Sequence, residues 1–269
     1  MYTNFGLIKE GQRMDLELEG RHAVVTGGSK GIGLAIARAL AAEGVRLTLV
    51  ARDPAALEHA AQQIGGEVAV RAADLATDAG RRALAEAVPA PDILVNNAGA
   101  IPAGRLSDVS LDAWRAGWEL KVMGYVHLCQ LYLPAMTARG SGTILNVIGM
   151  GGRAVRPGYI CGAAGNAALI GFTNALGAEA QAHGVRVLGI NPSPTLTDRM
   201  ERHMRDRAAS ELGDEARWRE FVQPDAFPFG RPKTPEEVGA LAAMLCSPKV
   251  TYLNGTVVDM DGGGQWTGR

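Results

Sequence analysis

A glycine-rich turn near the amino end carries the clearest chemistry in the sequence. It reads TGGSKGIG from Thr26 to Gly33 and separates an apolar run from an alanine-rich one. Glycines let the backbone turn sharply and approach a phosphate, and the amino end of a following helix offers free N–H groups and a positive dipole end. A lone glycine pattern is a weak signal, but here it stands between a strand pattern and a helix pattern. The turn therefore predicts a site for the pyrophosphate of a dinucleotide.

The segments around this turn alternate between short apolar runs and longer helical patterns. Continuous apolar runs are typical of strands buried on both faces, and they cover residues 22–26, 45–51, 67–72, 92–96, 143–148 and 185–190. Helical patterns over 33–43 and 54–64 lie between them, and Asp53 and Pro54 form a good start for the second. This alternation predicts βαβ units in a parallel sheet. The expected fold class is α/β, a single-domain Rossmann fold with a doubly wound, seven-stranded parallel sheet flanked by helices.

The domain organisation follows from the same pattern. Neither a linker-like stretch nor an internal repeat divides the chain, so one domain is expected over residues 18–269, after an N-terminal extension at 1–17. Two predicted helical segments, 112–138 and 163–180, are apolar on nearly every side. Such helices are buried by the sheet or by a partner subunit. We therefore expect a homo-oligomer, a dimer or a homotetramer, formed through these helices.

Composition narrows the functional classes. The net charge is −1 without long charged runs, which argues against nucleic acid or an anionic membrane as a partner. The first twenty residues contain no apolar core of signal-peptide length, and we expect no segment that approaches the roughly 18 apolar residues of a membrane helix. Cys129, Cys161 and Cys246 fit free thiols in a reducing cytoplasm and have no metal-ligand spacing. The expectation is a cytoplasmic protein with a small-molecule substrate and no metal site.

The glycine turn resembles the TGxxxGxG fingerprint of the short-chain dehydrogenase/reductase (SDR) family. Further markers follow in register: Asp74-Leu75, the NNAG signature at 96–99, Asn191-Pro192 with Thr197, and a closing segment at 231–263. The resemblance covers residues 18–264 and implies an NAD(P)-dependent oxidoreductase that interconverts a carbonyl and an alcohol. It also implies a set of cofactor-binding residues: Gly27, Ser29, Lys30, Gly31, Ile32, Gly33, Arg52, Asp74, Leu75, Asn97, Ala98, Gly99, Pro192, Thr195 and Thr197.

The end of the second predicted strand bears on the choice between NAD and NADP. An acidic side chain there accepts hydrogen bonds from the ribose 2′-hydroxyl, whereas an arginine suits a 2′-phosphate. In related sequences the acid would stand near Ala51, which leaves Arg52 free to meet a phosphate, and Lys30 could add a second charge. Alternatively, Arg52 is a solvated surface residue and Asp53 only caps the next helix. NADP is favoured, with NAD still possible.

The usual catalytic residues of the family are missing. The resemblance implies a tyrosine and a lysine four residues apart on the helix after the fifth strand, a serine before them, and an asparagine on the preceding long helix. Tyr159 is followed at the fourth position by Ala163, so the motif fails there. Alignment of residues 167–173 with the family's helix puts Gly162 at the tyrosine position and Asn166 at the lysine position. Gly149 then takes the serine position and Lys121 the asparagine position.

The replacements at 121 and 166 look like an exchange of lysine and asparagine. In the family these two positions face one pocket, so Lys121 would return an ammonium to it from the opposite wall. Lys121 is the only lysine within a strongly apolar helical run, where burial lowers the pKa of an ammonium, as proton transfer requires. Alternatively, Lys121 extends to water and has no role. The candidate catalytic residues are Lys121, Tyr159 and Asn166.

Two tyrosines could replace the missing phenol. Tyr159 lies three residues before Gly162 and shares its face if the helix has begun by then. Tyr125 lies one helical turn after Lys121. Each could equally be a packing residue.

The segment around 198–230 matches the family's variable substrate lid. Its first half carries four arginines: Arg199, Arg202, Arg205 and Arg207. One of them could bind an anionic substrate group, although a solvated amphipathic helix explains them as well. Substrate identity does not follow from these residues. Beside the oxidoreductase stand two alternatives: a nucleotide-binding protein without turnover, acting as a sensor or structural subunit, and a lyase or dehydratase that uses Lys121 as its base.

Overall fold

The computed structural model describes residues 14–266, whose strands form one parallel sheet in the order β3-β2-β1-β4-β5-β6-β7. The strands are β1 His22–Thr26, β2 Arg46–Ala51, β3 Val68–Ala72, β4 Ile93–Asn96, β5 Gly142–Val147, β6 Val185–Pro192 and β7 Thr256–Met260. The strand order reverses between β1 and β4. A doubly wound sheet binds its ligand at such a switch point, outside the carboxyl ends of the strands. The predicted fold class is confirmed.

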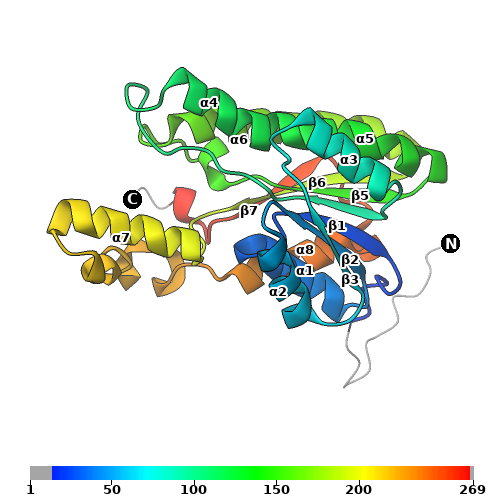
Figure 1. Ribbon diagram of the computed structural model, residues 1–269, viewed down its shortest axis with the longest axis horizontal. Helices are drawn as coiled ribbons and strands as arrows, with labels where there is room; N and C mark the ends of the chain where they lie inside the picture. Colours follow the sequence, from blue (N-terminus) through cyan, green and yellow to red (C-terminus); the bar gives the residue numbers. More distant parts are fainter. Residues whose placement is uncertain (1–13, 267–269) are drawn as a thin grey trace.

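Helices cover both faces of the sheet (Figure 1). One layer contains α1 Gly31–Ala42, α2 Pro54–Ile64 and α8 Pro235–Cys246, and the other contains α3 Asp78–Ala87, α4 Leu111–Trp118, α5 Gly124–Arg139 and α6 Ile160–Ala180. Each layer packs on its own cluster of buried aliphatic side chains. Helix α7, Asp198–Leu212, projects beyond the sheet together with short 3-10 turns (Figure 1). This projection is the segment predicted as a lid.

The sequence pattern predicts most element bounds to within three residues. Strand β1 and helix α2 have the predicted bounds, and the Asp53 carboxylate caps α2 as expected. Strand β3 differs in burial, because most of its residues are partly or fully exposed. It is the edge strand, so the prediction of burial on both faces is wrong there. Leu16 and Leu18 pack in the core, so the folded unit begins before residue 18; residues 1–13 of the predicted extension lie outside the described residues.

The predicted helix over 112–138 is interrupted in the structure. Between α4 and α5 the backbone forms one π-helical turn, η1 Glu119–Met123, which contains Lys121. A buried arginine stabilises this turn: Arg81 donates to the Glu119 carboxylate at 2.8 Å and to the Leu75 carbonyl at 3.0 Å. Turns of this kind inside α-helices are frequent at functional sites. Lys121 thus lies in a π turn that a buried arginine supports.

One helical stretch corrects an expectation about membranes. Residues Ile160–His183, which include α6, are long and apolar enough to cross a membrane by length and composition. A helix packed on a sheet meets the same criteria, and 44% of its most apolar window is buried inside this protein. The expectation that no segment would reach this length missed the stretch because glycine, asparagine and threonine interrupt its apolar residues.

Candidate active site

The glycine turn after β1 has the geometry of a phosphate cradle. Gly27 and Gly31 adopt positive φ angles of 65° and 56°, which side chains rarely tolerate. A Cβ on Gly33 would overlap the Gly27 carbonyl. No side chain caps α1, whereas side chains cap α2, α3, α4, α7 and α8. The first amides of α1 are therefore left for an external anion.

Hydrogen bonds connect this turn to the loop after β4. The buried Thr26 hydroxyl accepts from the backbone amides of Asn97 and Ala98 at 2.9 and 3.0 Å and donates to the Val95 carbonyl. The Asn97 side chain donates to the Thr26 carbonyl at 2.9 Å. These bonds fix Gly27 and the segment 97–99 on either side of the switch point. The two cofactor-binding segments predicted from sequence are thus brought together.

The end of β2 shows which groups are free for a ribose or its phosphate. Asp53 uses its carboxylate to accept from the amides of Ala55 and Ala56, at 3.0 and 3.2 Å. Arg52 is exposed, and Ala51 at the strand end has no polar side chain. Lys30 is also exposed, at the amino end of α1. Asp53 is therefore occupied in capping, while two cations remain accessible near the turn.

The remaining predicted cofactor residues contribute in different ways. Leu75 packs its side chain into the core, and Asp74 is exposed and accepts from the Ala76 amide. Thr195 donates its hydroxyl to the Ser193 carbonyl. Thr197 caps α7, and its methyl carbon lies 3.4 Å from the position of a Cβ on Gly31. The start of the lid therefore lies over the phosphate turn. The other predicted residues of these segments are partly buried: Ser29, Ile32 and Pro192.

Lys121 lies at the carboxyl ends of β4 and β5. The carbon chain of Lys121 packs on Gly99, where an added Cβ would lie 2.9 Å from its Cδ. Nζ donates to the Ile148 carbonyl oxygen at 2.5 Å. Burial, and then the positive charge of Arg199, lowers the pKa of this ammonium from 10.5 to about 8. The ammonium is therefore held by a backbone carbonyl, in a side chain that is partly buried.

Tyr159 occupies the space beside Gly162. A Cβ on Gly162 would overlap the Tyr159 ring at Cζ and Cε1. Tyr159 is the cap residue before α6, with a non-helical backbone, so the condition that the helix has begun by Tyr159 does not hold. The ring nevertheless reaches Gly162, and it also lies 3.0 Å from the position of a Cβ on Gly151. Burial raises the pKa of this phenol, with Arg199 opposing the shift, so the hydroxyl is protonated at neutral pH.

Asn166 borders the same loop from α6. Its side chain is 1% exposed, and its Nδ2 lies 3.1 Å from the position of a Cβ on Gly149 and 3.4 Å from one on Gly151. The buried Oδ1 has no hydrogen-bond partner among residues 14–266. A buried acceptor without a donor is costly, so this oxygen is suited to an incoming hydroxyl or water. Lys121 and Asn166 thus flank one segment, 148–151.

Tyr125 is not available as a phenol for substrate. It is 1% exposed, and its hydroxyl donates to the Val147 carbonyl at 2.9 Å. Burial raises its pKa above the ordinary value. Its interpretation as a packing residue is therefore correct.

Arg199 is the lid arginine that reaches the site. Its NH2 group donates to the Gly99 carbonyl oxygen at 2.8 Å, across the cleft from α7 to the loop after β4. Arg205 and Arg207 instead pair with glutamates on their own helix. The sequence signals that could have singled out this site are the glycines of the 149–152 segment, which leave room for Tyr159 and Asn166.

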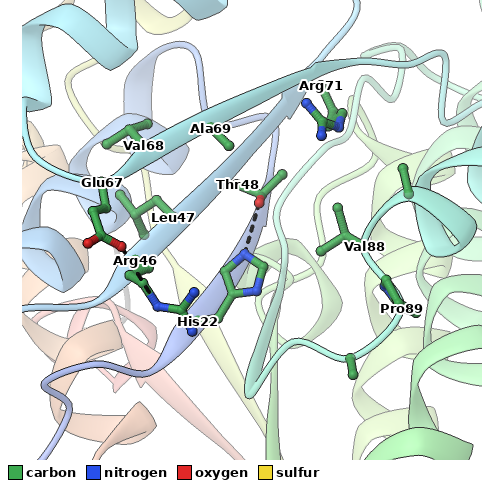
Figure 2. A pocket seen from close by; sticks show the side chains of 12 residues that line it. His22, Arg46, Leu47, Thr48, Glu67, Val68, Ala69, Arg71, Val88 and Pro89 are labelled. Atoms are coloured by element: carbon green, nitrogen blue, oxygen red, sulfur yellow. Dashed lines mark hydrogen bonds and ion pairs between the residues drawn. The ribbon is translucent and has the colours of Figure 1, made fainter.

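A second hollow lies away from this site. It is lined by His22, Arg46 and Glu67 at the amino ends of β1, β2 and β3, with Thr48 and Val88 beside them. Figure 2 shows His22 directed at Thr48, with 2.9 Å between Nε2 and Oγ1. Ligands of doubly wound sheets bind at the carboxyl ends, so this hollow is not the nucleotide cleft. No group of three or more metal-ligating side chains occurs within residues 14–266.

Comparison with known proteins shows similarity along most of the chain. Residues 21–208 match the short chain dehydrogenase family. The chain is 38% identical over 257 residues to galactitol 2-dehydrogenase (L-tagatose-forming) of Cereibacter sphaeroides, covering 93% of this chain and 97% of that protein. It is 33% identical over 258 residues to D-beta-hydroxybutyrate dehydrogenase of Cupriavidus necator, covering 91% and 98%. L-sorbose reductase of Gluconobacter frateurii, solved with NADPH and L-sorbose, superposes with a TM-score of 0.87 and 34% identity, covering 93% and 98%.

The fold and the cradle define a nucleotide-binding Rossmann protein. The chain belongs to the short chain dehydrogenase family. It is accordingly an NAD(P)-dependent oxidoreductase for alcohol or carbonyl substrates.

Proposed function

We propose that this protein is an NADPH-dependent oxidoreductase whose active site is built around Lys121 instead of the family's usual catalytic residues. The observation that carries the proposal is the position of Lys121, whose carbon chain packs on Gly99 and whose ammonium donates to the Ile148 carbonyl. These two residues follow β4 and β5, at the sheet edge where a nicotinamide ring must lie for hydride transfer. A positive charge at that point stabilises negative charge that develops on a substrate oxygen.

The described residues fit the cofactor. The uncapped amino end of α1 would bind the pyrophosphate, and the exposed Arg52 and Lys30 would bind a 2′-phosphate. The unpartnered Oδ1 of Asn166 would accept a hydrogen bond from a hydroxyl of the nicotinamide ribose, to which a lysine at this position would instead donate. When bound, NADPH supplies a hydride from its nicotinamide ring. NADPH is present in the similar L-sorbose reductase structure.

Tyr159 supplies the proton in this proposal. Because Gly162 has no side chain, the Tyr159 ring occupies the space in which the family's tyrosine would begin. The raised pKa keeps the phenol protonated, so it can give its proton to the carbonyl oxygen as the carbonyl carbon receives the hydride. The resulting phenolate lies within the field of Arg199 and is reprotonated from solvent. The alcohol product then leaves with the hydride on its carbon and the proton from Tyr159 on its oxygen.

Matched variants test this assignment. Tyr159→Phe and Lys121→Met should each lower kcat for NADPH-dependent carbonyl reduction by about 100-fold or more, with NADPH affinity, followed by nucleotide fluorescence, changed less than twofold. Tyr125→Phe is the control, because the Tyr125 hydroxyl bonds only to the Val147 carbonyl. Full turnover in both test variants would refute the proposed site. If the unaltered protein binds NADPH tightly but oxidises none with any carbonyl, a sensor without turnover replaces the enzyme.

We also infer that the protein works in the cytoplasm as a homo-oligomer, a homotetramer in the simplest case. Support comes from α6, whose outer face exposes small side chains that allow a second helix to approach closely: Ala164, Ala167, Ala168, Gly171 and Ala175. The mass measured by light scattering tests the oligomer directly. A monomer at micromolar concentration would contradict it.

A further inference from the structure

Arg199 is placed to meet a ligand rather than to stabilise the fold. It is the second residue of α7, the helix that projects beyond the sheet (Figure 1). One of its nitrogens, NH2, donates to the Gly99 carbonyl, and this is the only hydrogen bond of its guanidinium within residues 14–266. A guanidinium carries five N–H donors, so most of its fork remains open. Arg199 is exposed, so these donors are accessible to a ligand, and its positive charge acts on Lys121.

Several lid arginines are paired, but Arg199 has no carboxylate partner. Arg205, Arg207, Arg217 and Arg231 each pair with a glutamate at 2.7 or 2.8 Å. No carboxylate lies within ion-pair distance of Arg199 in the described part of the chain. The exposed Arg202 has no ion pair there either, but of these arginines Arg199 is the one that contacts the loop after β4.

A second unneutralised cation lies in the same cleft. The carbon chain of Lys121 packs on the residue whose carbonyl Arg199 contacts, and the ammonium of Lys121 is bonded to a carbonyl, not to a carboxylate. Arg199 is one of the two causes that lower the pKa of Lys121 to about 8, which shows that the two charges act on each other across the site. An anion between them would relieve this repulsion.

We propose that Arg199 binds a carboxylate of the substrate, so that the preferred substrates are oxo acids and hydroxy acids. A planar guanidinium matches a carboxylate through two parallel hydrogen bonds, and such charge-assisted pairs are the strong ones. The carboxylate would replace the Gly99 carbonyl as the partner of NH2. The reacting carbonyl would then lie farther into the cleft, toward Lys121 and Tyr159. This inference rests on the proposed function, because it assigns the substrate class of that site.

The phosphates of the cofactor are the other possible source of an anion. Within the lid, the residue that lies over the phosphate turn is Thr197, whose methyl carbon approaches the Gly31 position at 3.4 Å. Arg199 contacts Gly99 instead, on the Lys121 side of the cleft. The geometry therefore favours a substrate carboxylate over the cofactor pyrophosphate as the anion that Arg199 binds. Loss of Arg199 would impair use of the acid substrate in the first case and binding of NADPH in the second.

The test compares paired substrates in the full-length protein. Candidate oxo acids are each assayed beside the corresponding methyl ester, which has the same carbonyl but no carboxylate. In the unaltered protein the acid should be the better substrate in kcat/KM. Arg199→Gln should lower kcat/KM for the acid by roughly 10- to 100-fold, chiefly through KM, lower kcat/KM for the ester much less, and leave the affinity for NADPH nearly unchanged. Arg199→Lys should recover part of the loss.

Arg202→Gln is the matched control, since Arg202 is an exposed arginine of the same helix, three residues farther on. Equal losses on acid and ester, or a loss confined to NADPH affinity, would overturn the carboxylate assignment in favour of a general or phosphate role. An ester preference in the unaltered protein would overturn it as well. Absence of NADPH oxidation with every carbonyl would instead refute the proposed function, so the two failures are distinguishable.

Discussion

Replacement of Lys121 by methionine should make the folded protein more stable at neutral pH while it removes activity. Methionine keeps the carbon chain that packs on Gly99 but has no charge to desolvate. In the unfolded chain the pKa of Lys121 returns to its ordinary value of 10.5, whereas in the folded protein it is about 8. At roughly 1.4 kcal/mol per pH unit, this difference means that the buried charge costs about 3 kcal/mol when fully protonated.

The sign of the effect follows from proton linkage. Between pH 8 and 10.5 the unfolded chain binds the proton more tightly than the folded protein, so the stability of the unaltered protein rises with pH in this window. Loss of the hydrogen bond to the Ile148 carbonyl offsets the gain in the variant by about 1 kcal/mol. Lys121→Met should therefore be about 2 kcal/mol more stable at pH 7. At pH 9.5 the Lys121 charge still costs the unaltered protein about 1 kcal/mol. The free energies of unfolding of the two proteins should therefore be nearly equal at that pH.

Urea unfolding at pH 7.0 and pH 9.5 measures this difference. The control is Lys249→Met, which removes an exposed lysine that pairs with Glu17 and should change stability little and equally at both pH values. A Lys121→Met protein that is less stable at pH 7, or that differs from the unaltered protein by the same amount at both pH values, would refute the reasoning. Stability gained where activity is lost is the trade-off expected of an active-site charge.

Three further predictions concern the phenol and the cofactor cleft. Gly162→Ala should lower kcat by about 100-fold because its methyl group displaces the Tyr159 ring. Gly158→Ala is the control and should leave kcat unchanged, because there is open space around the added atom. Steady-state kinetics with carbonyl substrates check both variants. Arg52→Ala should weaken NADPH binding about tenfold and leave NADH unchanged; equal affinities before and after would exclude a 2′-phosphate contact. Gly33→Ala should abolish nucleotide binding, measured by calorimetry, because its Cβ overlaps the Gly27 carbonyl; retained affinity would show that the turn is not the cradle.

The sequence predicted the fold because the signals for it are local. Apolar runs, the Asp53 cap and the glycine turn each depend on neighbours within a few residues, and β1 and α2 have the predicted bounds. Strand–helix alternation then restricts the sheet to few topologies, since parallel crossovers have one hand. The edge position of β3 is a property of the whole sheet, so its exposure did not follow from its own residues.

The candidate site was only partly predictable. The sequence made Lys121 and Asn166 candidates by their types and register, but the π turn that contains Lys121 is bonded to the buried Arg81, almost forty residues away. The reach of Tyr159 onto Gly162 depends on a non-helical cap residue, which the helical pattern did not indicate. Each of these features requires segments that are adjacent only in the folded chain.

By itself the sequence determined the α/β class and the glycine turn after the first strand. Only the tertiary structure decided which of four lid arginines reaches the loop after β4, since the bond from Arg199 to Gly99 joins positions 100 residues apart. It also decided that Tyr125 is a packing residue and that the Lys121 ammonium donates to the Ile148 carbonyl. The physical reason is that turns and helix periods are properties of short segments, whereas burial and charge pairing depend on what the rest of the fold brings alongside them.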